Sequence, residues 1–97
     1  MRIISAGTLR KYWTNHKETE EPLRAWVGFA KRADWKSPKD IKKQFTKACI
    51  LSGNRAVFDI CGGNYRLVIK VNYEHRIVWI RFLGTHTEYD KINAEEI

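Results

Sequence analysis

Three strand-length stretches with short turns between them dominate the second half of this sequence. The stretches are Arg55–Cys61, Tyr65–Asn72 and Ile77–Leu83, and the residues between them, Gly62–Asn64 and Tyr73–Arg76, are typical of tight turns. Strands joined by turns this short pair with their neighbours in an antiparallel sense. The pattern therefore predicts a small antiparallel meander sheet.

The first half of the chain follows a helical spacing instead. Met1–Ile4 is expected to be a short strand, after which apolar residues recur at helical intervals in Leu9–His16 and in Glu18–Ala33. A third, shorter helix is expected to follow Ser37, a residue that favours the N-cap position. We therefore expect one domain that spans the whole chain, of the α+β class, with N-terminal helices packed on the meander sheet.

Length and composition restrict the class of protein. The 97 residues are 43% hydrophobic and 30% charged, which favours a folded chain. No apolar run approaches the roughly 18 residues that a membrane-spanning helix needs, and Met1–Ser5 lacks the pattern of a signal peptide. We expect a cytoplasmic protein with no membrane contact. Cys49 and Cys61 lack the spacing of a zinc site, so we expect reduced core residues and no metal.

The net charge of +7 is concentrated in the first half, above all between Lys31 and Lys47, where only Asp34 and Asp40 offset the cations. Such a field favours a polyanion such as nucleic acid. A solvated helical face would explain the same charge, so the composition leaves both interpretations open. The lysines expected to point outward from the third helix are Lys39, Lys42, Lys43 and Lys47.

Cationic residues interrupt the apolar strands. Strict alternation places Arg66 and Lys70 on one face of their strand. On the last strand it places Arg81 on the same face as Trp79, opposite Phe82. Because apolar strand positions rarely hold cations, each of these cationic side chains is expected on an exposed or electrostatically occupied face. That face is the candidate site.

A short polar segment after the last strand supplies an imidazole, a phenol and carboxylates. In a helical turn His86, Tyr89 and Asp90 lie at i, i+3 and i+4 and point the same way. Metal-free phosphodiester cleavage needs one group to take a proton from the ribose 2′-OH and another to protonate the leaving 5′-oxygen. It also needs cations to stabilise the charged transition state. Together with Arg66 and Arg81, this segment contains those groups.

The residue types suggest roles. His86 is the candidate general acid or base, because an imidazole ordinarily titrates near pH 6.5. Tyr89 would need a lowered pKa to act as a base, but as a neutral phenol it can act as an acid or stack on a nucleobase. Arg66 and Arg81 offer bidentate forks for phosphate oxygens, and Lys70 adds a point charge. A surface segment that merely ties down the C-terminal tail would contain the same residue types.

Three segments of the chain, Asn54–Ile60, Gly63–Tyr73 and Ile80–Ile92, resemble the HigB toxins of bacterial type II toxin-antitoxin systems, a branch of the RelE superfamily. The resemblance extends over essentially the whole chain. It implies a compact RelE-like α+β toxin that cleaves mRNA, in most relatives on the translating ribosome, with neither metal nor cofactor. It also implies a HigA-type antitoxin with a helix-turn-helix domain, and contact with operator DNA only through that antitoxin.

Matched residue by residue, the resemblance implies an RNA-facing site composed of Asn54, Arg55, Arg66, Lys70, Arg81, His86 and Tyr89. The lysine-rich third helix would dock on ribosomal RNA through phosphate contacts or receive an acidic antitoxin segment. Three alternatives stay open: a noncatalytic module that binds RNA or the ribosome, a ribonuclease that works without ribosomes, and a structural partner whose sheet edge accepts a peptide strand.

Overall fold

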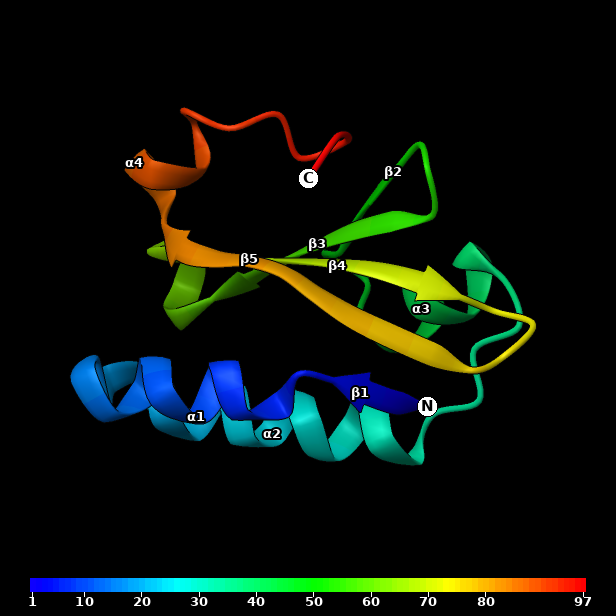
Figure 1. The fold of residues 1–97 in the computed structure, drawn as a ribbon, viewed down its shortest axis with the longest axis horizontal. Helices are drawn as coiled ribbons and strands as arrows, with labels where there is room; N and C mark the ends of the chain where they lie inside the picture. The colour runs from blue at the N-terminus through cyan, green and yellow to red at the C-terminus, as the bar shows by residue number, and fades with distance from the viewer.

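The computed structural model describes residues 1–97 and combines helices with a five-stranded sheet (Figure 1). In chain order the elements are β1 (Arg2–Ile4), α1 (Ala6–Asn15), a 3₁₀ turn (Lys17–Thr19), α2 (Glu20–Arg32), α3 (Pro38–Gln44), β2 (Cys49–Leu51), β3 (Arg55–Ile60), a second 3₁₀ turn (Cys61–Gly63), β4 (Tyr65–Asn72), β5 (Ile77–Thr85) and α4 (His86–Tyr89). The predicted α+β class is confirmed.

The order of strands in the sheet is β1-β5-β4-β3-β2. β3, β4 and β5 form the expected antiparallel meander, and β2 extends it by a fourth antiparallel strand that the sequence analysis did not assign. β1, however, runs parallel to β5 and pairs Arg2 with Ile77 and Ile4 with Trp79. The prediction of a purely antiparallel sheet is therefore wrong. The parallel pair joins the two ends of the chain, a long-range contact that no local pattern records.

α1 and α2 lie side by side below the sheet, whereas α4 and the C-terminal segment lie above it (Figure 1). The helical stripes bury Leu9 from α1 and Leu23, Trp26 and Ala30 from α2 against the lower face. Each such buried large side chain contributes about 1.5–3 kcal/mol relative to an exposed one. The sheet side of this main core consists of Ala56, Phe58, Ile60, Leu67, Ile69, Val71 and Val78.

The pairing of β4 with β5 is interrupted by a bulge. Val68 pairs with Phe82 and the next residue, Ile69, pairs with Ile80, so Arg81 is left without a partner across the strands. The extra residue reverses the alternation beyond it. As a result Phe82 packs with Val68 on the upper face, and Leu83 packs against the main core below. The predicted faces of the last strand are therefore wrong for Phe82 and Leu83.

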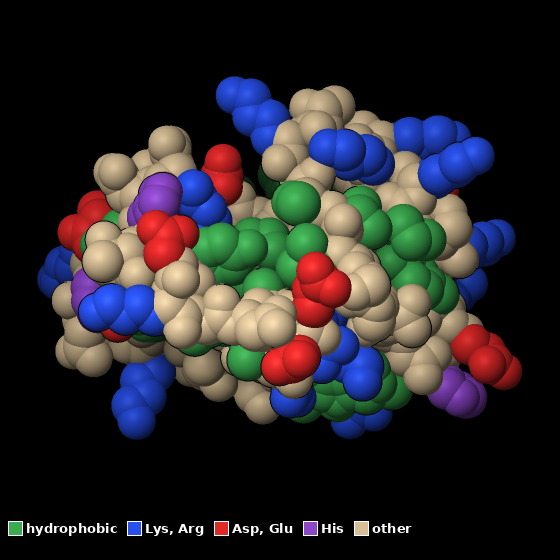
Figure 2. Space-filling view, turned by 90° about the horizontal axis from the view of Figure 1, so that it is seen from above, with side chains coloured by type: hydrophobic (Ala, Val, Ile, Leu, Met, Phe, Trp, Pro, Cys, Tyr) green, Lys and Arg blue, Asp and Glu red, His purple; other side chains and the backbone are tan.

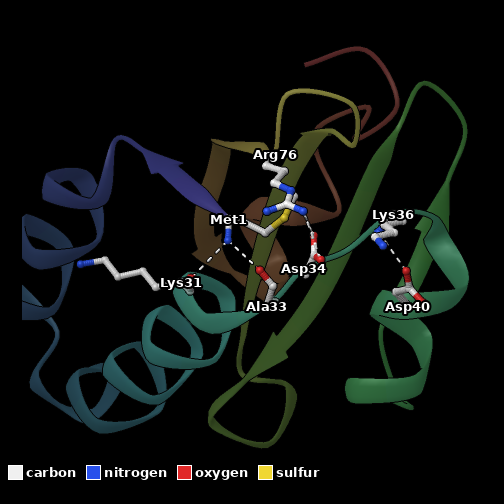
Figure 3. Close-up of polar contacts among 7 residues, drawn as sticks. All are labelled: Met1, Lys31, Ala33, Asp34, Lys36, Asp40 and Arg76. Atoms are coloured by element: carbon white, nitrogen blue, oxygen red, sulfur yellow. Dashed lines mark hydrogen bonds and ion pairs between the residues drawn. The ribbon is translucent and has the colours of Figure 1, made fainter.

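Contacts around the N-terminus hold the chain ends and loops together (Figure 3). The Met1 ammonium donates to the carbonyl oxygens of Lys31 (3.2 Å) and Ala33 (2.8 Å), at the end of α2. Arg76, in the turn before β5, forms an ion pair of 3.1 Å with Asp34 in the loop after α2. These contacts fix β1 and the β4–β5 turn to the helical layer.

The cysteines differ from the expectation. Cys49 is exposed at the start of β2, and Cys61 is partly buried with its thiol donating to the carbonyl oxygen of Glu18 (3.1 Å). Cys49 is not a core residue because β2 is an edge strand whose upper face is only partly covered. Both thiols are unpaired. None of the helices has the length and apolar character needed to span a membrane.

Candidate functional site

The upper face of the sheet, opposite α1 and α2, carries two separate polar regions. The register of β3 with β4 places Asp59 beside Arg66 at one end and Arg55 beside Lys70 at the other. We call these the Arg66 end and the Lys70 end. Figure 2 looks onto this face and shows hydrophobic side chains between charged ones. The buried members of that central cluster are Val57, Val68 and Ala94.

α4 lies at the Arg66 end and is fixed there by local hydrogen bonds. The Thr85 hydroxyl accepts from the backbone N–H of Glu88 (3.1 Å), and the Glu88 carboxylate accepts from the backbone N–H of Thr85 (2.9 Å), which forms a capping box. The bond from the Thr85 backbone also lowers the pKa of Glu88. The backbone N–H of His86 donates to the Asn64 carbonyl (2.9 Å), so α4 is tied to the β3–β4 turn.

The predicted contact within this helical turn is present. His86 Nδ1 lies 3.0 Å from Asp90 Oδ2, and the two side chains are 55% and 58% exposed. A carboxylate that accepts from Nδ1 leaves the lone pair of the neutral ring on Nε2. Nε2 has no partner within the chain and is open to a ligand. His86 therefore offers a proton acceptor whose ring is oriented by Asp90.

Arg66 is held from two sides. Its Nε lies 3.1 Å from Asp59 Oδ1, and its Nη1 donates to the Gly63 carbonyl. The guanidinium carbon is 5.9 Å from the centre of the Tyr89 ring, in a cation–π arrangement. The side chain is only 18% exposed, and Nη2 has no partner in the chain. Arg66 thus presents an oriented cation with free donor capacity at this end of the sheet.

Tyr89 joins α4 to the sheet. Its ring lies 6.4 Å from that of Phe82, the apolar residue displaced to this face by the bulge. Partial burial raises the pKa of Tyr89, with a smaller contribution from Cys49, while Arg66 acts in the opposite direction. The condition set for Tyr89 as a base, a lowered pKa, is not met. The phenol stays protonated and acts as a hydrogen-bond donor or as a stacking surface.

The Lys70 end forms a shallow hollow of about 480 Å³. Lys70 has no ion-pair partner there, and Trp79 of β5 lies directly across from it. Asn54 forms the turn between β2 and β3 with φ of 60°, and its carbonyl accepts from the Val71 N–H (2.8 Å). The residues that line the hollow are Asn54, Lys70, Val71, Asn72, Tyr73, Glu74 and Trp79.

Two residues predicted to contact RNA, Arg55 and Lys42, donate their side-chain hydrogen bonds to backbone carbonyl oxygens of the chain itself. Arg55 Nε donates to the Ile97 carbonyl (2.7 Å) and its Nη1 to the Gly53 carbonyl (3.1 Å), so Arg55 anchors the C-terminal segment. Lys42 Nζ donates to the carbonyl oxygens of Thr46 (2.8 Å) and Ala48 (2.6 Å), where it stabilises the end of α3.

The remaining cations lie outside the Arg66 end. Lys70 is four residues further along β4, about 13 Å away at the usual rise of a strand. Arg81 is the exposed bulge residue. α3 packs into the lower layer through the buried Ile41, so its lysines flank the sheet edge. The structure therefore brings Tyr89 against Arg66, with His86 in the same helical turn as Tyr89, but leaves out Arg81. The exposed lysines of this segment are Lys39, Lys42, Lys43 and Lys47.

Comparison with known protein families matches residues 19–92 to HigB_toxin, described as the RelE-like toxic component of a toxin-antitoxin system. The chain belongs to this family. The matched range extends from the end of the first 3₁₀ turn to beyond α4 and contains both ends of the upper face. As the toxin of such a system, this family member has an antitoxin as its partner. No curated protein matches the chain.

Two residues of this toxin's candidate site escaped sequence reasoning. Asp59 orients Arg66, and Cys49 lies close enough to Tyr89 to affect its pKa. The sequence pattern did not indicate Asp59, because a turn of Gly62–Asn64 pairs Cys61 with Tyr65 and so places Asp59 opposite Leu67. In the structure Cys61 belongs to the turn, and this shift of one residue brings Asp59 opposite Arg66. Nothing in the sequence indicated Cys49 either. β2 is a three-residue edge strand, and so short a run of residues does not determine how the strand pairs with β3.

Proposed function

We propose that this toxin is an endoribonuclease that cleaves mRNA, without a metal, by attack of a ribose 2′-oxygen on the adjacent phosphate. The observation that carries the proposal is that one helical turn, α4, presents the His86–Asp90 pair and also packs Tyr89 against the Arg66 guanidinium. In this member of the HigB toxin family, His86 is the proton acceptor, Arg66 is the oriented cation and Tyr89 is the neutral phenol. A proton acceptor for the 2′-OH and a cation for the charged transition state are two of the groups that phosphodiester cleavage requires.

In the proposed reaction His86 Nε2 takes the proton from the 2′-OH, and Asp90 stabilises the imidazolium that forms. The 2′-oxygen bonds to phosphorus and the bond to the 5′-oxygen breaks. The leaving 5′-oxygen takes a proton from water, so the products are a 2′,3′-cyclic phosphate and a 5′-OH end, and the His86 imidazolium returns its proton to solvent. Arg66 Nη2 donates to a nonbridging oxygen as charge develops there. Tyr89 hydrogen-bonds to the phosphate or supports a nucleobase, and it does not act as a base.

We further propose that cleavage takes place on the translating ribosome. The His86 side chain is more than half exposed, and charges in water interact weakly. A ribosome that covers the upper face excludes water from this surface and holds the mRNA against it. Lys39, Lys43, Lys47 and Lys70 are placed to contact RNA phosphates outside the point of cleavage, whereas Lys42 is engaged by backbone carbonyls.

The partner that we propose is a HigA-type antitoxin with a helix-turn-helix domain, which neutralises the toxin in the bacterial cytoplasm. Operator DNA is contacted only through this antitoxin. An adjoining short reading frame that encodes a helix-turn-helix protein is the expected genetic context. Its protein product should bind this toxin in solution.

The experiment that tests the function is a cell-free bacterial translation reaction with the purified protein. Primer extension maps 5′ ends on the message with ribosomes present and on naked RNA. Cuts that require ribosomes support the proposal. Cuts on naked RNA at the same sites would show a ribosome-independent ribonuclease, and an intact message in both reactions would overturn the nuclease assignment.

The separation of the two polar regions favours one second candidate, a noncatalytic module that binds RNA or the ribosome. Lys70, Arg81 and the α3 lysines bind phosphates without any help from His86. Such a module would inhibit translation in the same assay while leaving every message whole. Cosedimentation with ribosomes, measured beside cleavage, separates the two functions.

Tyr89→Phe tests the role of the phenol. The ring and its packing on Phe82 are retained, and only one neutral hydrogen-bond donor is lost. Such a bond is worth about 0.5–1.5 kcal/mol, so we expect the cleavage rate to fall by no more than about tenfold. A loss of 10²-fold or more, of the order expected for a general acid or base, would contradict the supporting role proposed for Tyr89.

A further inference from the structure

An apolar groove on another side of the molecule is not used by the proposed reaction. It has a volume of about 540 Å³ and lies between α2 and the segment that joins α3 to β2. Phe29 lines it, and with 46% of its surface exposed it is the one large hydrophobic residue of the chain that is not largely buried. The lining residues that the argument uses are Trp26, Phe29, Phe45, Lys47, Phe58 and Asp59.

The walls of the groove are ordered by aromatic packing. Phe45 lies in edge-to-face contact with Phe29 (6.1 Å between ring centres) and with Phe58 (5.0 Å), and Trp26 contacts Phe58 in the same way (5.4 Å). The indole N–H of Trp26, which is 3% exposed, has no acceptor in the chain. Covering an apolar surface of this kind with another apolar surface is favourable.

The charges around the groove favour a negatively charged partner. The Arg32 guanidinium lies 5.8 Å from the centre of the Phe29 ring, and Lys47 lines the opposite wall. Neither cation has a carboxylate partner, whereas Asp59, the acidic residue of the lining, is neutralised by Arg66. The groove therefore offers an apolar floor with an uncompensated positive rim. This pattern is complementary to apolar side chains flanked by carboxylates.

We infer that this groove binds an acidic amphipathic segment of the antitoxin. The inference rests on the assignment of the chain as the toxin of a toxin-antitoxin pair, but it does not require that the toxin be a nuclease. An RNA strand fits less well, because the floor of the groove is apolar. Through the Asp59–Arg66 pair, the bound segment lies next to the Arg66 end and is able to influence it.

The experiment uses the full-length toxin and the protein encoded by the adjoining reading frame, with hydrogen exchange measured on the free and bound toxin. Protection of the α2 residues 22–29 together with residues 44–48 supports the inference. Protection confined to α4 would overturn it by placing the antitoxin over the candidate active site. Protection confined to β2 would overturn it in favour of strand addition at the sheet edge.

Variants of exposed residues supply the second measurement. In titration calorimetry Phe29→Glu is expected to weaken antitoxin binding by at least about tenfold, and Phe29→Leu to retain it, because an apolar anchor is lost only in the first. Arg32→Glu should weaken binding and reduce its salt dependence. Lys31→Glu makes the same charge change one residue away, on a side chain that does not lie over the Phe29 ring as Arg32 does, and is the matched control.

The outcome is independent of the nuclease assignment. Equal affinities for wild type, Phe29→Glu and Arg32→Glu would overturn the groove as the docking site. Weakened binding in a protein that cuts no message would uphold the groove and reject the proposed reaction. Binding of naked RNA that is lost in Phe29→Glu, with antitoxin binding unchanged, would assign the groove to RNA and also overturn the inference.

Discussion

Replacing His86 with alanine is expected to lower the rate of ribosome-dependent mRNA cleavage by about 10²- to 10⁴-fold, the usual contribution of a positioned general base. The reason is geometric: Asp90 orients the ring, and Nε2 is the acceptor left free. Binding to ribosomes should change by less than twofold, because the phosphate contacts are assigned to lysine and arginine side chains that this substitution leaves in place. Primer extension gives the cleavage rate, and sedimentation with ribosomes gives the binding.

His75→Ala is the matched control for this variant. His75 is exposed in the turn between β4 and β5, and the hydrogen bond recorded there, to the Asn72 side chain, uses its backbone N–H and so survives the substitution. Because His86 and Asp90 are both more than half exposed, neither alanine variant should change the free energy of unfolding by more than about 0.5 kcal/mol. Loss of cleavage together with ribosome binding in His86→Ala would favour the noncatalytic module instead.

Local patterns predicted those parts of the site that depend on neighbours in sequence. The helical turn at His86 follows from spacing and from the Thr85–Glu88 capping box, and the face shared by Arg66 and Lys70 follows from alternation within one strand. Both are set by the backbone period, which a few residues determine.

The features that the sequence analysis predicted wrongly or missed depend on contacts between segments that are distant in the chain. The bulge at Arg81 moves Phe82 to the upper face, where it supports Tyr89, and nothing in the β5 sequence marks the extra residue. The parallel pairing of β1 with β5 and the C-terminal segment that engages Arg55 likewise join residues far apart in the chain. Such contacts are selected by the packing of the whole sheet and not by local propensity.

Arg66→Ala is expected to lower the cleavage rate by about 10²- to 10³-fold, comparable to the loss of one preorganised donor to a developing negative charge. The guanidinium is fixed by Asp59, Gly63 and Tyr89, so its free Nη2 requires no reorganisation as the transition state forms. Arg66→Lys retains the positive charge, but its single ammonium nitrogen cannot pair with Asp59 and donate to the phosphate in the fixed geometry of the guanidinium. We therefore expect an intermediate rate. The measurement is the single-turnover rate of cleavage on programmed ribosomes.

Arg76→Ala supplies the comparison for the loss of an ion-paired arginine. Arg76 pairs with Asp34 at 3.1 Å, as Arg66 pairs with Asp59, but it lies in the β4–β5 turn away from α4. Removal of either arginine should cost stability by about 1 kcal/mol or less, as judged by denaturant unfolding, because one or both partners are solvent-exposed. If both variants lose cleavage equally, the effect reflects net charge, and Arg66 has no special part in the reaction. If only Arg66→Ala loses it, the cation held between Asp59 and Tyr89 acts on the phosphate itself.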